Sequence, residues 1–95
     1  MKIYVDDLRP VPPGYKCARS VNQAIALIEK AENDGDEIEL LDLDHDLGDF
    51  EPDGGDAIKL LDWLVERETF YPVEIHTQNI VGRANMERIL RRFWK

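Results

Sequence analysis

The sequence predicts a small α/β domain built on a parallel sheet. Short apolar runs that suit buried strands alternate with segments whose apolar residues recur at helical spacing. In chain order these segments read strand, strand, helix, strand, helix, strand, helix. Strands that alternate with helices form parallel sheets with right-handed crossovers. The 95 residues suffice for one domain, residues 1–95, with a marginal core.

The first two strands are expected at Lys2–Val5 and Tyr15–Ala18. Between them, Arg9–Gly14 holds three prolines in four positions, which excludes a helix because proline lacks a donor and fixes φ. An ordinary parallel crossover needs a dozen or more residues. The link from Leu8 to Gly14 is shorter, so it must run extended across the sheet, or the second strand is only a stub.

The first helix is expected to begin at Ser20 as N-cap. Gln23, three residues on, completes a capping-box pattern. The sequence Asn33-Asp34-Gly35 ends the helix, since glycine readily takes the left-handed conformation of a C-cap. The apolar residues of this segment recur at helical spacing: Val21, Ala24, Ile25, Ile28 and Ala31.

The second half of the chain predicts two more strands and two more helices. The strands are Ile38–Leu43, apolar enough for a central parallel strand, and Pro72–Thr77. Asp56 is expected to cap the middle helix, and the last helix runs from about Val81 to Phe93. The middle helix presents an inward stripe of Ala57, Leu60, Leu61, Leu64 and Val65.

Composition limits the function classes. The net charge of −8 argues against extended nucleic-acid binding, which needs a basic face. Thirteen acidic residues lie between Glu29 and Asp56, whereas Arg83–Lys95 carries five basic ones. These are either two solvated faces of opposite sign or an acidic, metal-binding pole beside a basic helix that attracts phosphate. Composition alone leaves both open.

The sequence also predicts a compartment. No apolar run approaches the ~20 residues of a membrane span, and Met1 leads directly into a strand-like segment rather than a signal peptide. Cys17 is the single cysteine, which excludes an internal disulfide and a cysteine-based zinc site. A reducing cytoplasm fits best, with no membrane partner.

Polar residues follow three of the predicted strands. They are Asp6-Asp7, Asp44-His45-Asp46 and the segment His76–Asn79. Loops are polar anyway, so one such segment means little. Ligands of open parallel sheets bind beyond the carboxyl ends of the strands, however, and all three segments fall there. We therefore expect one polar site at this edge of the sheet.

The residue types at this edge suit metal and phosphate chemistry. Crowded carboxylates repel one another unless a cation neutralises them, and oxygen ligands suit Mg²⁺ or Mn²⁺. Both histidines of the chain fall here and offer proton transfer near neutral pH, although either could be only a packed, hydrogen-bonded side chain. Asn79 and Gly82 begin the last helix, where backbone N–H groups favour an anion; Asn79 could equally be only an N-cap.

Several of these segments resemble response-regulator receiver domains. Val5-Asp6-Asp7 is similar to the end of the first receiver strand, whose acidic pair holds Mg²⁺. The segment 40–44 (LLDLD) resembles the strand that ends in the phospho-accepting aspartate, here Asp44. The segment 72–77 (PVEIHT) resembles the strand that ends in the switch hydroxyl, here Thr77. The chain departs from receivers because a proline loop replaces the first helix and the fifth strand, with its lysine, is missing.

These departures and three longer motifs resemble a smaller family, the cyclic-phosphate-processing receiver domains. The motifs are 6–12 (DDLRPVP), 43–48 (LDHDLG) and 76–86 (HTQNIVGRANM). The resemblance covers nearly the whole chain. It implies a truncated receiver or flavodoxin-like fold with strand order 2-1-3-4 and three flanking helices. We expect the helix after Ser20 on one face of the sheet, and the other two on the opposite face or around its edge.

The family resemblance implies metal-assisted processing of cyclic phosphates, for which RNA 2′,3′-cyclic ends are one candidate substrate. On this interpretation Asp6, Asp7 and Asp44 hold Mg²⁺ or Mn²⁺. His45 or His76, with Asp46, moves a proton. Asp42 lies one layer deeper than Asp44 on the same side of its strand and does not touch the ion. The phosphate-binding residues would be Arg9, Thr77, Asn79, Gly82, Arg83 and Asn85.

Two other interpretations remain at this point. The chain could be a non-catalytic or phospho-accepting receiver module that acts through a protein partner, for which the exposed loop 49–55 would serve. The missing lysine counts against phosphorelay. A small haloacid-dehalogenase-like phosphatase is suggested by Asp42-Leu43-Asp44, but that chemistry wants the pair after the first strand, a downstream lysine and a larger core. The sequence leaves open whether the protein turns a substrate over or only binds it.

Overall fold

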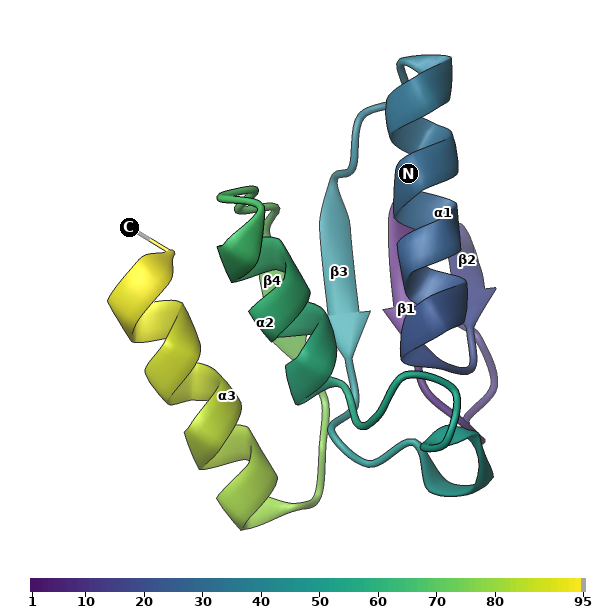
Figure 1. Ribbon diagram of the computed structural model, residues 1–95. Helices are drawn as coiled ribbons and strands as arrows, with labels where there is room; N and C mark the ends of the chain where they lie inside the picture. Colours follow the sequence, from purple (N-terminus) through teal and green to yellow (C-terminus); the bar gives the residue numbers. More distant parts are fainter. Residues whose placement is uncertain (95) are drawn as a thin grey trace.

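The computed structural model describes residues 1–94, and its elements follow the predicted order (Figure 1). A short 3₁₀ helix, η1, is added in the acidic loop after the third strand. The elements are β1 (Lys2–Val5), β2 (Tyr15–Ala18), α1 (Val21–Asp34), β3 (Leu40–Leu43), η1 (Gly48–Phe50), α2 (Ile58–Glu66), β4 (Val73–Ile75) and α3 (Ile80–Phe93).

The four strands form one sheet in the order β2-β1-β3-β4, and every pair is parallel. This confirms the predicted strand order. Tyr4 pairs with Cys17 on one side and with Asp42 on the other, and Asp42 pairs in turn with Glu74. Residues in register share a face, so these four side chains belong to the same face of the sheet.

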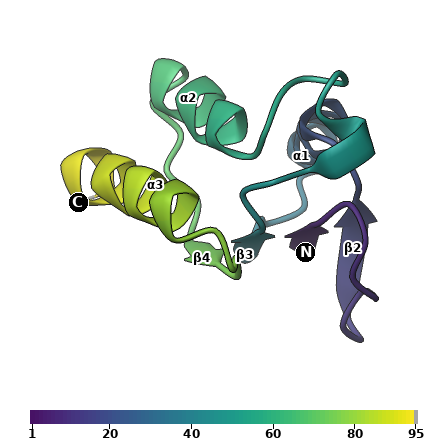
Figure 2. The ribbon, with the colours of Figure 1, turned by 90° about the horizontal axis from the view of Figure 1, so that it is seen from below.

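All three helices lie on the other face, which corrects the expected distribution over two faces (Figure 2). The direction of the crossovers accounts for the side on which α1 and α2 lie. The chain moves from β2 past β1 to β3, and then from β3 to β4, in the same direction along the sheet. Two right-handed crossovers in the same direction place their helices on the same side. Only the β1–β2 link runs in the opposite direction, and it carries no helix.

The core therefore has two layers, helices over one face of the sheet. Alternate residues of β1 and β3 point into it, namely Ile3 with Leu41 and Val5 with Leu43, and all four are fully buried. α1 contacts α2, and α2 contacts α3. The helices close the core with Val21, Ala24, Ile28, Ala31, Leu60, Leu61, Leu64 and Met86.

Local signals account for most element ends. Ser20 caps α1 by accepting from the Gln23 backbone N–H at 3.0 Å, and Gly35 ends the helix with φ 75°, as predicted. The Gln23 side chain accepts from the backbone of Arg19 rather than from that of Ser20. Asp56 is not the cap of α2, which corrects that expectation. Its carboxylate instead accepts from the backbone N–H of Leu47 at 3.0 Å.

β2 pairs with β1 over all four of its residues, and residues 6–14 join the two strands without a helix. Arg19 holds the start of this link, since its guanidinium donates to the backbone oxygens of Asp6 and Arg9, each at 2.9 Å. Among residues 1–94, no helix is long and apolar enough to cross a membrane.

Candidate functional site at the carboxyl edge of the sheet

The strands all point toward one edge of the sheet, the lower edge in Figure 1. The three polar segments predicted from the sequence leave the sheet there. Asp6-Asp7 follows β1, Asp44-His45-Asp46 follows β3, and His76–Asn79 follows β4. The backbone N–H of Asp44 donates to Val5 and that of His76 to Leu43, so the three strand ends are joined by hydrogen bonds.

Three carboxylates meet at this edge, as predicted. Asp6, Asp7 and Asp44 can each place one oxygen within 4.8 Å of the other two. Asp6 is 1% exposed, and most of its hydrogen-bonding capacity is already used. Its Oδ1 accepts from the backbone N–H groups of Leu8 and Arg9 at 2.9 and 2.8 Å, and its Oδ2 is 2.9 Å from Nε2 of His76.

These contacts decide the ionisation of Asp6. Burial by itself would raise the pKa of this carboxyl group. The two backbone donors and His76 outweigh burial, and together they hold the pKa of Asp6 below its usual value. A carboxylate offers about four lone-pair positions, so about one, on Oδ2, is left for another ligand.

Asp7 and Asp44 are half-buried and supply the rest of the group. Asp44 accepts from the backbone N–H of His45 at 2.8 Å through Oδ1. The Asp7 carboxylate lies against Gly48, where a side-chain carbon would collide with its Oδ2, and Gly48 has φ 50°. Gly48 therefore leaves the space that the Asp7 carboxylate occupies. Mg²⁺ takes one or two carboxylates together with waters, so this donor set fits a hard divalent cation.

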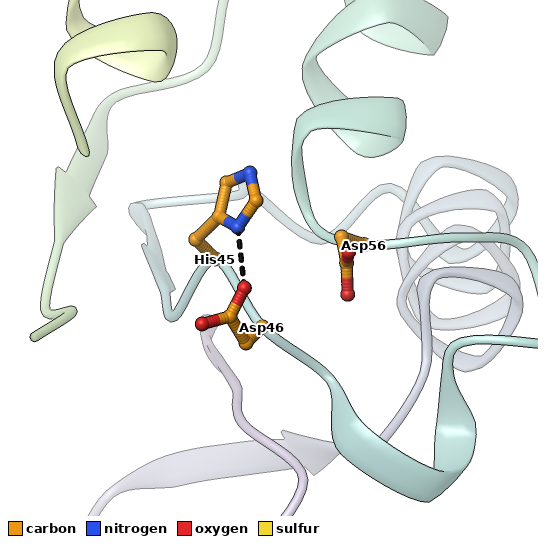
Figure 3. A group of neighbouring side chains, drawn as sticks. All are labelled: His45, Asp46 and Asp56. Atoms are coloured by element: carbon orange, nitrogen blue, oxygen red, sulfur yellow. Dashed lines mark hydrogen bonds and ion pairs between the residues drawn. The ribbon is translucent and has the colours of Figure 1, made fainter. Parts of the chain in front are cut away.

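A second polar group lies beside the first. His45, Asp46 and Asp56 can each place a ligand atom within 4.8 Å of the others (Figure 3). Its internal bonds account for this closeness, because Nδ1 of His45 is 2.8 Å from Asp46 and Asp56 accepts from Leu47. An ionised carboxylate can only accept, so Nδ1 of His45 carries the proton in this bond. Nε2 points away from Asp46 and makes no hydrogen bond within residues 1–94.

The start of α3 fixes the other side of this group. The His45 ring packs so closely on Gly82 that a side chain at Gly82 would lie 2.5–2.8 Å from ring atoms. Asn79 is the N-cap of α3, one of the two roles considered for it, and its side chain accepts from the Gly82 N–H at 2.9 Å. Its amide also donates to both oxygens of Asp46 at 3.1 Å. His45 chiefly, with Asn79, lowers the pKa of Asp46 against a smaller effect of burial.

The second histidine has a different environment. Nδ1 of His76 is 2.5 Å from Asp42 and Nε2 is 2.9 Å from Asp6, so the imidazole bridges two carboxylates. Tyr4 stacks on the ring with centroids 4.4 Å apart and planes 3° apart. His76 thus lies on the bare face of the sheet, away from the helices.

The predicted phosphate-binding residues fall into two groups. Arg9 and Arg83 both reach the end of β4, since Arg9 donates to the backbone oxygen of His76 at 3.2 Å and Arg83 to that of Ile75 at 2.9 Å. Thr77 accepts from the backbone N–H of Asn79 at 3.2 Å. Asn85 lies further along α3, and the only hydrogen-bond partner of its side chain within residues 1–94 is Arg88. The structure thus gives the Asn85 side chain no hydrogen bond to the other predicted site residues.

Three contributors escaped the sequence reasoning. Asp42 was expected one layer deeper than Asp44 and without a partner, although a lone charge in an otherwise apolar strand signals one. The space that Gly48 leaves for the Asp7 carboxylate is visible only in the structure. Tyr4 reads as an ordinary buried strand residue, and nothing in the sequence indicates its stacking on His76.

Comparison with known proteins identifies a family. A family model described as the cyclic-phosphate processing receiver domain matches residues 1–92. No curated protein and no solved structure matches the chain. The family match spans every strand and helix described above except the last residue of α3, and it includes all of the residues gathered at the carboxyl edge of the sheet.

Proposed function

Because this chain belongs to the family of cyclic-phosphate processing receiver domains, we propose that it is a divalent-metal-dependent phosphoesterase that opens cyclic phosphates. The observation that carries the proposal is the meeting of Asp6, Asp7 and Asp44 next to a histidine–aspartate pair. Metal ligands and an acid–base pair side by side are the parts that hydrolysis of a phosphate ester requires.

Asp7 and Asp44 would hold the ion, with Asp6 offering its remaining lone pair on Oδ2. When bound, Mg²⁺ or Mn²⁺ polarises a phosphoryl oxygen and lowers the pKa of a water molecule. The three carboxylates otherwise repel one another, so a cation relieves the repulsion as it binds. Gly48 leaves room for the Asp7 carboxylate in this position.

His45 is the better candidate for proton transfer. Asp46 holds the ring through Nδ1, so in the neutral ring Nε2 is the acceptor that can take a proton from the attacking water. Hydrolysis adds this water across one P–O bond of the ring: the hydroxide part bonds to phosphorus as the P–O bond breaks, and the proton taken by Nε2 passes to the released alkoxide oxygen, which leaves a phosphate monoester. Both nitrogens of His76 are already bonded to Asp6 and Asp42, which leaves neither for substrate.

Arg9 and Arg83 support the binding of phosphate oxygens. Each arginine donates from one guanidinium nitrogen to a backbone oxygen at the end of β4. This bond anchors the guanidinium and leaves its other N–H donors for phosphate oxygens. They approach that end from different elements, Arg9 from the proline link and Arg83 from α3. A phosphate between the two arginines would lie beyond the end of β4, next to the carboxylates of Asp6, Asp7 and Asp44.

The test is a screen of 2′,3′-cyclic nucleotides, other cyclic phosphates and linear esters with Mg²⁺ or Mn²⁺. We expect metal-dependent ring opening, lost in Asp44→Ala. His45→Ala should reduce the rate by about 10²–10⁴-fold, the usual contribution of a general acid or base, with a much smaller change in substrate affinity. Glu74→Gln, an exposed charge change on the sheet face away from the helices, serves as the control.

Two results would contradict the proposal. One is hydrolysis that persists undiminished in Asp44→Ala, which would indicate a contaminating activity or another site. The other is a protein that binds Mg²⁺ or Mn²⁺ but opens none of the cyclic phosphates. Phosphorylation of Asp44 by a small phosphodonor, detected by mass spectrometry, would then favour a phospho-accepting module instead.

A further inference from the structure

The bare face of the sheet holds a chain of polar contacts that ends at the proposed metal site. Asp42 contacts Nδ1 of His76, and Nε2 of His76 contacts Oδ2 of Asp6. The three residues come from β3, from the end of β4 and from the end of β1, so the chain crosses three neighbouring strands. The face of the His76 ring is also in contact, because the Tyr4 ring stacks parallel to the imidazole.

This chain fixes the orientation of the Asp6 carboxylate. Two backbone N–H groups hold Oδ1, and His76 holds Oδ2, so the carboxylate cannot rotate without breaking a hydrogen bond. The lone pair left on Oδ2 therefore has one direction. Asp6 is 1% exposed, and water cannot readily replace the contact with His76.

The ring in turn depends on Asp42. The side chains of His76 and Asp42 are 18% and 15% exposed, so both are largely shielded from solvent. Nδ1 of the ring faces Asp42 while Nε2 faces Asp6, so the imidazole is held between the two carboxylates. Asp42 thereby fixes which way the ring faces, as carboxylates do for histidines around metal centres.

We propose that His76 and Asp42 are positioning residues that hold Asp6 ready for a divalent cation and transfer no proton. This inference rests on the proposed function only in assuming that Asp6, Asp7 and Asp44 bind a cation. Outer partners of metal ligands typically control affinity by 10–100-fold. His76 and Asp42 would then determine how tightly the cation is held.

His76→Ala separates positioning from simple competition because the two predict opposite signs. The contact with His76 competes with a cation for Oδ2 of Asp6, so its loss alone should tighten cation binding. Loss of the Asp6 orientation should weaken it. We expect a Kd for Mn²⁺ that is 10–100-fold higher in His76→Ala, measured by calorimetry with the metal alone.

His76→Gln supplies the rescue. Its carboxamide is neutral but keeps an N–H donor for Asp6, so we expect it to recover part of the lost affinity. Asp42→Asn, which keeps an acceptor for the ring, should weaken binding less than Asp42→Ala. Glu74→Gln is the matched control, because Glu74 pairs with Asp42 in the sheet but makes no hydrogen bond to His76. It should leave the Kd unchanged.

Nuclear magnetic resonance provides a readout independent of activity. The ring nitrogen and proton signals of His76 can be assigned because they survive in His45→Ala. They should shift in Asp42→Asn. They should also shift when the wild-type protein is titrated with Mg²⁺, which is used in place of Mn²⁺ because it is diamagnetic. Thermal unfolding checks that each variant is folded at the temperature of the titration.

The outcomes separate this inference from the proposed function. Mn²⁺ binding that is unchanged or tighter in a folded His76→Ala protein would overturn the inference, while the metal site itself would stand. Weakened binding with rescue by glutamine would support it, even if no cyclic phosphate were hydrolysed. A wild-type protein that binds no Mn²⁺ would overturn both.

Discussion

The two faces of the sheet differ in what covers them and in what they contribute. On the helix side, Leu41 and Leu43 are fully buried in the core. On the bare side, Tyr4 and Asp42 pack against His76, with no helix above them. In the same short strands, the residues facing the helices therefore form the core, and the alternate residues on the other face contact a residue of the candidate site. Substitutions on one face should affect stability, and those on the other should affect binding.

Neighbouring leucines of β3 give the largest expected contrast. Leu41→Ala removes a fully buried side chain on the helix side and should lower the free energy of unfolding by about 2–5 kcal/mol. Leu40→Ala, half-buried on the bare side, should cost less than half as much. Urea denaturation measures both. Equal losses would break the comparison, because they would show that the bare face contributes as much packing energy as the core.

Two glycines test whether the site depends on backbone shape. Gly48 and Gly14 both have positive φ, at 50° and 86°, so alanine at either should cost roughly 1–2 kcal/mol of stability. Only at Gly48 does the new carbon meet Asp7, whereas at Gly14 nothing lies within 4 Å. Gly48→Ala should therefore also weaken Mn²⁺ binding in calorimetry. A similar Kd in both variants would mean that the Asp7 carboxylate adjusts freely.

The N-caps of α1 and α3 offer a smaller contrast. Ser20→Ala and Asn79→Ala each remove a side-chain acceptor from a helix start and should each cost about 1 kcal/mol in chemical denaturation. Ser20 otherwise contacts Asp53, outside the site, whereas Asn79 holds Asp46. Only Asn79→Ala should weaken the binding of inorganic phosphate or a cyclic nucleotide. Equal binding by both variants would assign Asn79 to capping alone.

The smallest effect concerns acid stability. The pKa of Asp46 in the folded protein lies below the unfolded value of about 3.9, chiefly because His45 donates to it. Ionised Asp46 therefore stabilises the fold at higher pH, and this contribution is lost as pH falls through the folded-state pKa. The difference in Tm between wild type and Asp46→Asn should shrink below about pH 4. A constant difference across that range would show that the His45 contact adds nothing.

The order of elements and the strand order followed from the sequence because they depend on local signals and on crossover geometry. Apolar periodicity found the strands, and Ser20 and Gly35 marked the ends of α1. The predicted distribution of the helices over two faces is wrong, because both helical crossovers run in the same direction along the sheet. Asp56 looks like a helix cap in the sequence. Its carboxylate instead accepts a hydrogen bond from the backbone N–H of Leu47, at the other end of the acidic loop. Such a contact depends on tertiary structure and leaves no local signal.

For the candidate site, the sequence located the edge but not the connections within it. Strand ends bring Asp6, Asp7 and Asp44 together whatever their side chains do, so their meeting was predictable. The two histidines looked equivalent. Their roles separate only through contacts with residues on other strands, Asp42 and Tyr4 for His76, which periodicity does not pair.

The position of β1 has a consequence for how the chain folds as it is made. β1 is the first strand along the chain but an inner strand of the sheet, between β2 and β3. During translation it can pair with β2 early, but its other edge stays open until residues 40–43 emerge. Leu60, Leu61 and Leu64, which cover the growing sheet, follow later still. A chain stalled between β3 and α2 would therefore expose apolar sheet, and exposed apolar surface makes a nascent protein prone to aggregate.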